Sequence, residues 1–167
     1  MLRGIRKVAV VSAPRDEVWA AWTTPEAART FFAPAAHIEL ALGGAYELLF
    51  DLEAPPGAQG SEGMRVLSYL PPEMLSFEWN APPQFPTVRN GPRTWVVVRL
   101  DEYGSHATWL WLSHLGWREG EEWSAAFDYF ARAWDTVLGR LRQRFVSGPV
   151  DWDDPYRPTQ SFDVPAE

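Results

Sequence analysis

The chain has 167 residues, of which 46% are hydrophobic, and this size and composition suffice for one domain with a substantial core. Its formal net charge of -7 leaves no broad basic field to attract phosphates, which argues against nucleic acids and anionic membrane surfaces as partners. The absence of cysteine excludes disulfides, thiolate catalysis and sulfur-ligated metals.

The first predicted elements are a strand and two short helices. Residues 5–11 alternate in hydrophobicity as a strand does, and the strand ends before Pro14, which suits the first turn of a helix. Val18 and Trp22 then recur at helical spacing, and Pro25 starts a second short helix. The start of the chain lacks the apolar core of a signal peptide, and no stretch is apolar enough for membrane insertion, so we expect a cytoplasmic protein.

From residue 37 onward the hydrophobic period changes to two, which predicts a meander of antiparallel strands. We expect these strands over 37–40, 46–52, 64–70, 74–79, 94–100 and 107–115, separated by turns rich in glycine and proline. Gly57, Gly60 and Gly63 lie in one of these connections. Because no helix follows them to supply a dipole for phosphate, we interpret them as turn residues.

The closing element is predicted as a long amphipathic helix over residues 119–145. Its apolar side chains recur three or four residues apart and form a face that must be buried. This face comprises Trp123, Phe127, Phe130, Trp134, Leu138, Leu141 and Phe145. We therefore place one domain over residues 1–147, followed by a tail over 148–167 that we expect to be loosely packed or disordered.

The order of these elements and four local segments resemble a known superfamily. The segments are SAPRDEVW (12–19), FFAP (31–34), LPPEMLSF (70–77) and ATWLWLSH (107–114). They are similar to START-like (SRPBCC) domains, in the branch named after the activator of Hsp90 ATPase, although Phe31 stands where that branch usually has tryptophan. The resemblance implies an α+β helix-grip (START-like, Bet v 1-like) fold: a curved antiparallel sheet, a long C-terminal helix packed across it, and two short helices after the first strand.

For function, the resemblance implies an apolar cavity between the sheet and the last helix. Side chains alternate across a strand, so one set from each strand would point toward the apolar face of the helix. The predicted ligand-binding residues are Phe31, Tyr46, Leu48, Phe50, Phe77, Trp79, Val96, Val98, Leu110, Leu112, His114, Trp123, Phe127, Phe130 and Trp134. The alternative is that these side chains pack together as a solid core.

The opposite face of the sheet is predicted to carry a second group of large apolar side chains. The interface residues expected there are Trp95, Val97, Trp109 and Trp111, brought together by the turn that joins their strands. Monomers seldom expose so large an apolar patch, so we predict either a homodimer interface or cover from the C-terminal tail. A register error of one residue would exchange the two faces.

Histidine supplies little further chemistry, because the chain has only His37, His106 and His114. His106 and His114 would lie about 26 Å apart along an extended strand, so they cannot share a metal ion. No metal-binding motif occurs, and we expect no metal and no other cofactor. Within an apolar pocket His114 or Tyr46 could assist proton transfer, which makes them weak catalytic candidates; the alternative is that His114 only satisfies a hydrogen bond near the end of a strand.

We interpret the chain as a noncatalytic binding domain for a small hydrophobic or amphipathic molecule. Two alternatives stay open. One is an enzyme of the polyketide cyclase or aromatase kind that uses neither a metal nor a nucleotide cofactor. The other is a protein-interaction domain like the co-chaperone after which the branch is named, which would bind its partner through the outer tryptophans.

Overall fold

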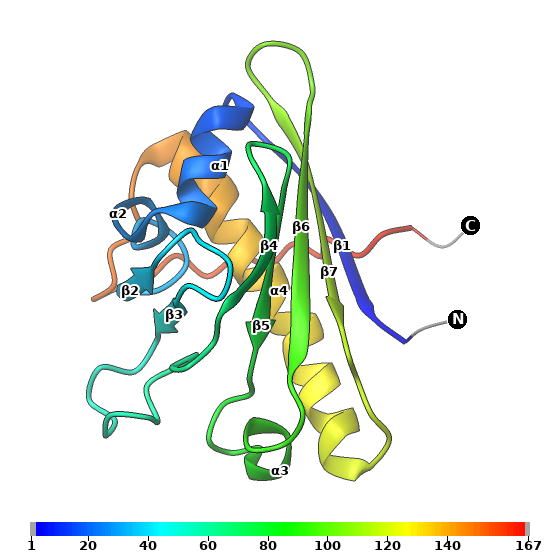
Figure 1. The fold of residues 1–167 in the computed structure, drawn as a ribbon. Coiled ribbons are helices and arrows are strands. Elements are labelled where there is room, and N and C mark those ends of the chain that lie inside the picture. The colour runs from blue at the N-terminus through cyan, green and yellow to red at the C-terminus, as the bar shows by residue number, and fades with distance from the viewer. Residues whose placement is uncertain (1–2, 166–167) are drawn as a thin grey trace.

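The computed structural model describes residues 3–165, so the first two residues of the predicted domain and the last two of the predicted tail lie outside it. A curved antiparallel sheet forms one layer, and helix α4 (Glu121–Ser147) crosses one face of that sheet (Figure 1). The strand order across the sheet is β1 (Ile5–Val11), β7 (Thr108–Leu115), β6 (Thr94–Glu102), β5 (Met74–Trp79) and β4 (Val66–Leu70). The predicted helix-grip fold is confirmed.

Three short helices and a second, two-stranded sheet complete the fold. They are α1 (Arg15–Thr23), α2 (Pro25–Ala28), β2 (Ala35–Ile38), β3 (Tyr46–Leu49) and α3 (Pro86–Arg89). Proline occupies the first turn of both α2 and α3, where its missing N–H needs no partner. The sequence prediction lacked α3, because four residues are too few to show helical periodicity.

The predicted single meander is interrupted between β3 and β4. β2 and β3 form a separate two-stranded sheet, and isolated bridges, Ala45 to Arg65 and Leu49 to Gly60, join this part of the chain to the segment that leads to β4. The predicted strand over 46–52 also ends early, at Leu49. The regular ladder stops there because the N–H groups of Phe50 and Asp51 both donate to one carbonyl, that of Gln59 (2.8 and 3.0 Å).

Helix α4 buries its aromatic face against the large sheet, as its periodicity predicts. Phe130, Trp134, Leu138 and Leu141 are all buried, and the inward side chains of β6 and β7 alternate with half-exposed outward ones. Within residues 3–165, none of the helices has the length and apolar character required to cross a membrane.

The C-terminal tail differs from the prediction of loose packing or disorder. It runs along α4 and the edge strand β1: Trp152 Nε1 donates to the carbonyl of Arg29 (2.7 Å), and Phe162 is buried. Its backbone also pairs with β1, because the N–H of Val8 donates to the carbonyl of Phe162 (2.9 Å). Aromatic anchors and strand pairing thus order a segment whose proline and aspartate content predicts disorder.

A buried lysine joins the tail to both layers. The side chain of Lys7 in β1 is 1% exposed, and its ammonium group donates to Asp135 of α4 (2.9 Å) and to Asp163 of the tail. Asp135 also accepts the backbone N–H of Phe162 (2.9 Å). Because a buried charge is stable only when it is paired, these carboxylates fix β1, α4 and the tail relative to one another.

Asp135→Asn should lower the free energy of unfolding by about 3 kcal/mol, because a buried cation then loses its less exposed partner. Asp163→Asn should cost less than about 1 kcal/mol, because the side chain of Asp163 is 71% exposed and its ion pair is screened by water. Urea denaturation followed by tryptophan fluorescence measures both losses. Equal losses in the two variants would contradict the unequal roles assigned here.

Candidate functional site

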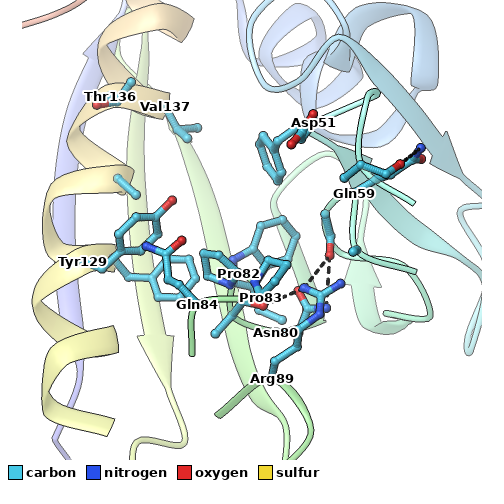
Figure 2. Close-up of a pocket in the computed structure, with 18 of the residues that line it drawn as sticks. Asp51, Gln59, Asn80, Pro82, Pro83, Gln84, Arg89, Tyr129, Thr136 and Val137 are labelled. Atoms are coloured by element: carbon cyan, nitrogen blue, oxygen red, sulfur yellow. Dashed lines mark hydrogen bonds between the residues drawn. The ribbon is translucent and has the colours of Figure 1, made fainter. Parts of the chain in front are cut away.

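A cavity of about 810 Å³ opens at one side of the sheet, between α4 and two loops. Figure 2 shows Tyr129, Thr136 and Val137 of α4 on one wall, facing Asp51 and Gln59 from the connection between β3 and β4. The connection between β5 and β6, which includes α3, closes the third side. The volume is in the range of pockets that enclose a drug-sized molecule.

Aromatic rings form the apolar part of the cavity. Trp79 and Trp134 lie 5.6 Å apart between ring centroids, and Phe32 lies 5.7 Å from Trp79 and 6.0 Å from Trp134. Phe50 is 6.1 Å from Phe32 and is 45% exposed, so it stands nearer to solvent than the other three rings. Phe32, Trp79 and Trp134 are almost fully buried, so Phe50 offers the largest ring surface to a ligand.

Behind the cavity, a chain of hydrogen bonds holds its two tryptophans. The indole N–H of Trp134 donates to Nδ1 of His114 (3.0 Å), and Nε2 of His114 lies 2.8 Å from the hydroxyl of Thr94. That hydroxyl donates to the backbone carbonyl of Trp79 (3.1 Å). The ring of Trp134 is therefore linked to the backbone of Trp79 through His114 and Thr94.

These partners define the state of His114. Because Trp134 donates to Nδ1 and Thr94 uses its proton elsewhere, the ring is neutral with its proton on Nε2. Burial lowers the pKa of His114 to about 3. His114 is fully buried and lies behind the cavity wall, so the geometry makes it a positioning residue for Trp134.

Tyr46, the other catalytic candidate, also lies away from the cavity. Its ring stacks on Phe77 with a centroid distance of 4.0 Å, and its hydroxyl donates to the carbonyl of Trp22 (2.8 Å). Burial raises the pKa of Tyr46 well above its ordinary value, which keeps the phenol protonated. Neither candidate is placed to exchange a proton with a molecule in the cavity.

The predicted ligand-binding residues divide into two groups. Phe50, Trp79, Phe130 and Trp134 line the cavity. The structure places the remaining ones in the packed interior or at the other end of α4: Phe31, Tyr46, Leu48, Phe77, Val96, Val98, Leu110, Leu112, His114, Trp123 and Phe127. Strand alternation identifies the face that a side chain occupies, but not its position along the helix.

Trp117 explains why the first turns of α4 do not border the cavity. Its indole N–H donates to the carbonyl of His114 (2.9 Å), and its ring lies 5.2 Å from Phe127 and 6.3 Å from Trp123. Gly116, with φ of 91°, allows the chain to turn back at this point. Trp117 therefore fills the space beneath the start of the helix.

The loop that contains Gly57, Gly60 and Gly63 forms one wall of the cavity and is held by internal hydrogen bonds. The carboxylate of Glu62 accepts backbone N–H groups from Gly57, Gln59 (3.0 Å) and Gly60 (2.7 Å). Burial raises the pKa of Glu62, but these hydrogen bonds outweigh that effect, so the pKa lies below its ordinary value. An internal carboxylate thus occupies the donors that a phosphate would need, in keeping with turn residues.

Arg89 of α3 completes this wall from the other side. It donates to the carbonyls of Gly57, Gly60 (3.1 Å) and Ala81 (2.6 Å), and its guanidinium lies 3.6 Å from Glu62. Figure 2 shows Arg89 beside Asn80, which also donates to Gly60 (3.2 Å). The two loops are therefore cross-linked.

On the outer face of the sheet, the predicted tryptophan cluster is divided. The rings of Trp109 and Trp111 stack with centroids 6.1 Å apart, but their partners on β6 are Asp101 and Arg99. Trp95 pairs with Leu115 and covers Gly116, so it lies near the other end of β7. Val97 pairs with Ser113. The expectation that the turn brings all four residues together is wrong. β6 continues to residue 102 and β7 begins at residue 108, so Trp109 and Trp111 pair with residues near the turn, whereas Trp95 and Val97 pair with residues farther from it.

Several cavity residues were not predicted from the sequence. These are Phe32, Asp51, Ala54, Pro55, Ala58, Gln59, Gly60, Asn80, Ala81, Pro82, Pro83, Gln84, Arg89, Tyr129, Arg132, Ala133, Thr136, Val137 and Arg140. Most of them lie in loops, whose path depends on tertiary contacts. The helical ones could have been predicted in part, because Arg132, Thr136 and Arg140 recur four residues apart and so lie on one side of the helix, beside its apolar face. No group of three or more metal-ligating side chains occurs among residues 3–165.

The sequence assigns the chain to a family. The sequence model described as Activator of Hsp90 ATPase homolog 1-like protein matches residues 12–145, and the chain belongs to this family. None of the curated proteins matches the chain in sequence.

Solved structures share the fold over most of the chain. A protein from Mesorhizobium loti is 21% identical, with a TM-score of 0.67 over 84% of this chain and 95% of that one. CalU16 from Micromonospora echinospora is 25% identical, with a TM-score of 0.66 over 90% and 78% of the two chains. An HSP90 activator from Plasmodium falciparum is 14% identical, with a TM-score of 0.64 over 86% and 94%.

The depressed pKa of His114 predicts that stability depends on pH. Below about pH 6.5 the unfolded chain binds a proton at this residue, whereas the folded protein does so only near pH 3. The contribution is therefore fully present above pH 6.5 and is lost as the pH falls toward 3. Between pH 7 and pH 5, His114 alone should reduce the free energy of unfolding by about 2 kcal/mol.

Urea titrations at pH 7, 6 and 5 measure this effect, with His114→Gln as the comparison. Glutamine retains an acceptor for Trp134 and a donor for Thr94 but does not titrate. Between pH 7 and pH 5, the free energy of unfolding of the variant should fall by about 2 kcal/mol less than that of the wild-type protein. An unchanged dependence in His114→Gln would assign the titration to another group.

Proposed function

We propose that the protein binds a small hydrophobic or amphipathic molecule in the cavity beside α4, without transforming it. The observation that carries the proposal is the cavity itself: about 810 Å³, with four aromatic rings on one side and polar side chains at its rim. Membership of a family built on this fold is consistent with a ligand-binding role.

The alternative of a cyclase or aromatase receives less support from the site. General acid–base catalysis needs a titratable group within hydrogen-bond reach of the substrate. The two side chains considered for that role, His114 and Tyr46, are fully buried behind other residues and already use their polar atoms internally. A binding function makes no such demand.

Ala133 offers a direct test, because it lines the cavity from α4 and a larger side chain at this position would enter it. Ala133→Trp should weaken binding of the neutral fluorescent probe N-phenyl-1-naphthylamine at least about tenfold, by filling the space that the probe needs. The matched control is Ala125→Trp, which adds the same group at an exposed position of α4. A folded Ala133→Trp variant that binds the probe like the control would refute cavity binding.

We further propose that the outer face pairs two copies of the chain through Trp109 and Trp111. In support, their stacked rings are half-exposed and lie beside Val8 and Val10 of β1, which extends the apolar area. Trp111→Arg should then convert a dimer to a monomer in native mass spectrometry while leaving the fold intact. A wild-type protein that is monomeric at micromolar concentration would reject the proposal.

A further inference from the structure

One edge of the cavity carries positive charge in an otherwise acidic protein. Arg132, Thr136 and Arg140 recur four residues apart on α4, so they lie on one side of the helix, one turn from each other. All three line the cavity. The helix therefore presents two guanidinium groups with a hydroxyl group between them to any molecule that enters.

These two arginines differ from the other cation of the cavity. Arg89 is committed to backbone carbonyls and Glu62, as described above. For Arg132 and Arg140, by contrast, the described part of the chain provides no carboxylate within ion-pair distance. Asp51, on the facing wall, is the carboxylate that lines the cavity, and it accepts the backbone N–H of Glu53 (3.1 Å).

The C-terminal tail holds Arg140 in place. Nε of Arg140 donates to the backbone carbonyl of Tyr156 (2.9 Å), and the guanidinium carbon lies 5.6 Å from the centroid of the Trp152 ring. Trp152 is itself fixed by its hydrogen bond to the carbonyl of Arg29. The tail thus engages one side of the guanidinium through Nε and through a cation–π contact.

The terminal nitrogens of Arg140 have no hydrogen-bond partner among the described residues, whereas its Nε does. Burial lowers the pKa of Arg140, and the nearby positive charge of Arg157 lowers it further. Among the described residues, no carboxylate lies within ion-pair distance to offset these two effects. A planar guanidinium that is oriented by one nitrogen and open at the other two is well suited to an anionic group with two or three oxygens.

We propose that the ligand is an amphipathic organic anion. Its apolar body lies against the aromatic side chains that line the cavity, and its anionic group binds Arg140 at the rim. The field of Arg132 adds to this attraction, and Trp152 acts as the positioning residue for Arg140. This inference rests on the proposed binding function and specifies the chemical class of its ligand. It predicts discrimination by charge between molecules with the same aromatic body.

Two fluorescent probes test that discrimination: 1-anilinonaphthalene-8-sulfonate, and N-phenyl-1-naphthylamine, which has the same rings without the sulfonate. Arg140→Gln should weaken binding of the sulfonate probe about tenfold and change binding of the neutral probe less than about twofold. The matched control is Arg99→Gln, which removes the same charge from the outer face of β6. It should leave the affinities for both probes unchanged.

Ala133→Trp separates failure of this inference from failure of the binding function. If Ala133→Trp abolishes binding of both probes but Arg140→Gln changes the affinity for neither, the cavity binds ligands and the proposed anion contact is wrong. Equal weakening of both probes by Arg140→Gln also overturns the inference, because Arg140 would then act on the cavity as a whole. If the folded Ala133→Trp variant still binds both probes with wild-type affinity, the proposed binding function in this cavity is refuted.

Trp152→Leu tests the positioning role of the tail. It should weaken binding of the sulfonate probe several-fold in the wild-type background and have no further effect in Arg140→Gln, because both changes act through one guanidinium. If Trp152→Leu lowers the affinity for the sulfonate probe equally in the wild-type and Arg140→Gln backgrounds, Trp152 acts independently of Arg140. Cooperative urea unfolding of each variant ensures that native protein is compared.

Discussion

The hydrogen bond from Trp134 to His114 is the interaction on which the cavity depends. It connects the middle of α4 to the centre of the sheet, and through Thr94 it reaches the backbone of Trp79 on the next strand. A neutral histidine that is satisfied at both nitrogens can be buried at little cost, whereas a charged one cannot. The interior therefore uses a neutral histidine to connect the indole ring of Trp134 to the backbone of β5.

The cavity exists because the helix and the loops are held apart by different means. On the sheet side, large rings set the distance to α4, and Trp117 closes the space under the start of the helix. On the open side, Glu62 and Arg89 cross-link the two loops, so these loops keep their shape without entering the space. The same aromatic content could otherwise have produced a solid core.

The sequence predicted the layers of this fold better than it predicted the site. Periodicity identified α4, and strand alternation identified the inward side chains of β6 and β7, because both patterns follow from local geometry. It could not identify the cavity walls contributed by loops, since the position of Gln59 or Arg89 depends on contacts with distant residues. It also placed Trp95 beside the other outer tryptophans, because a turn sequence does not fix how many residues each strand contributes before the turn.

The region matched by the family model ends at residue 145, so the tail lies beyond it, although Trp152 and the carbonyl of Tyr156 contact Arg140 at the rim of the cavity. A segment beyond the matched residues therefore lies at the rim of the cavity, next to Arg140. A change near Trp152 would alter the surroundings of Arg140 and leave the aromatic interior between α4 and the sheet as it is. The end of the same tail is tied to the core, because Phe162 is buried and Asp163 pairs with Lys7, so the part of the tail at the cavity rim can change independently of folding only while residues 162 and 163 are kept.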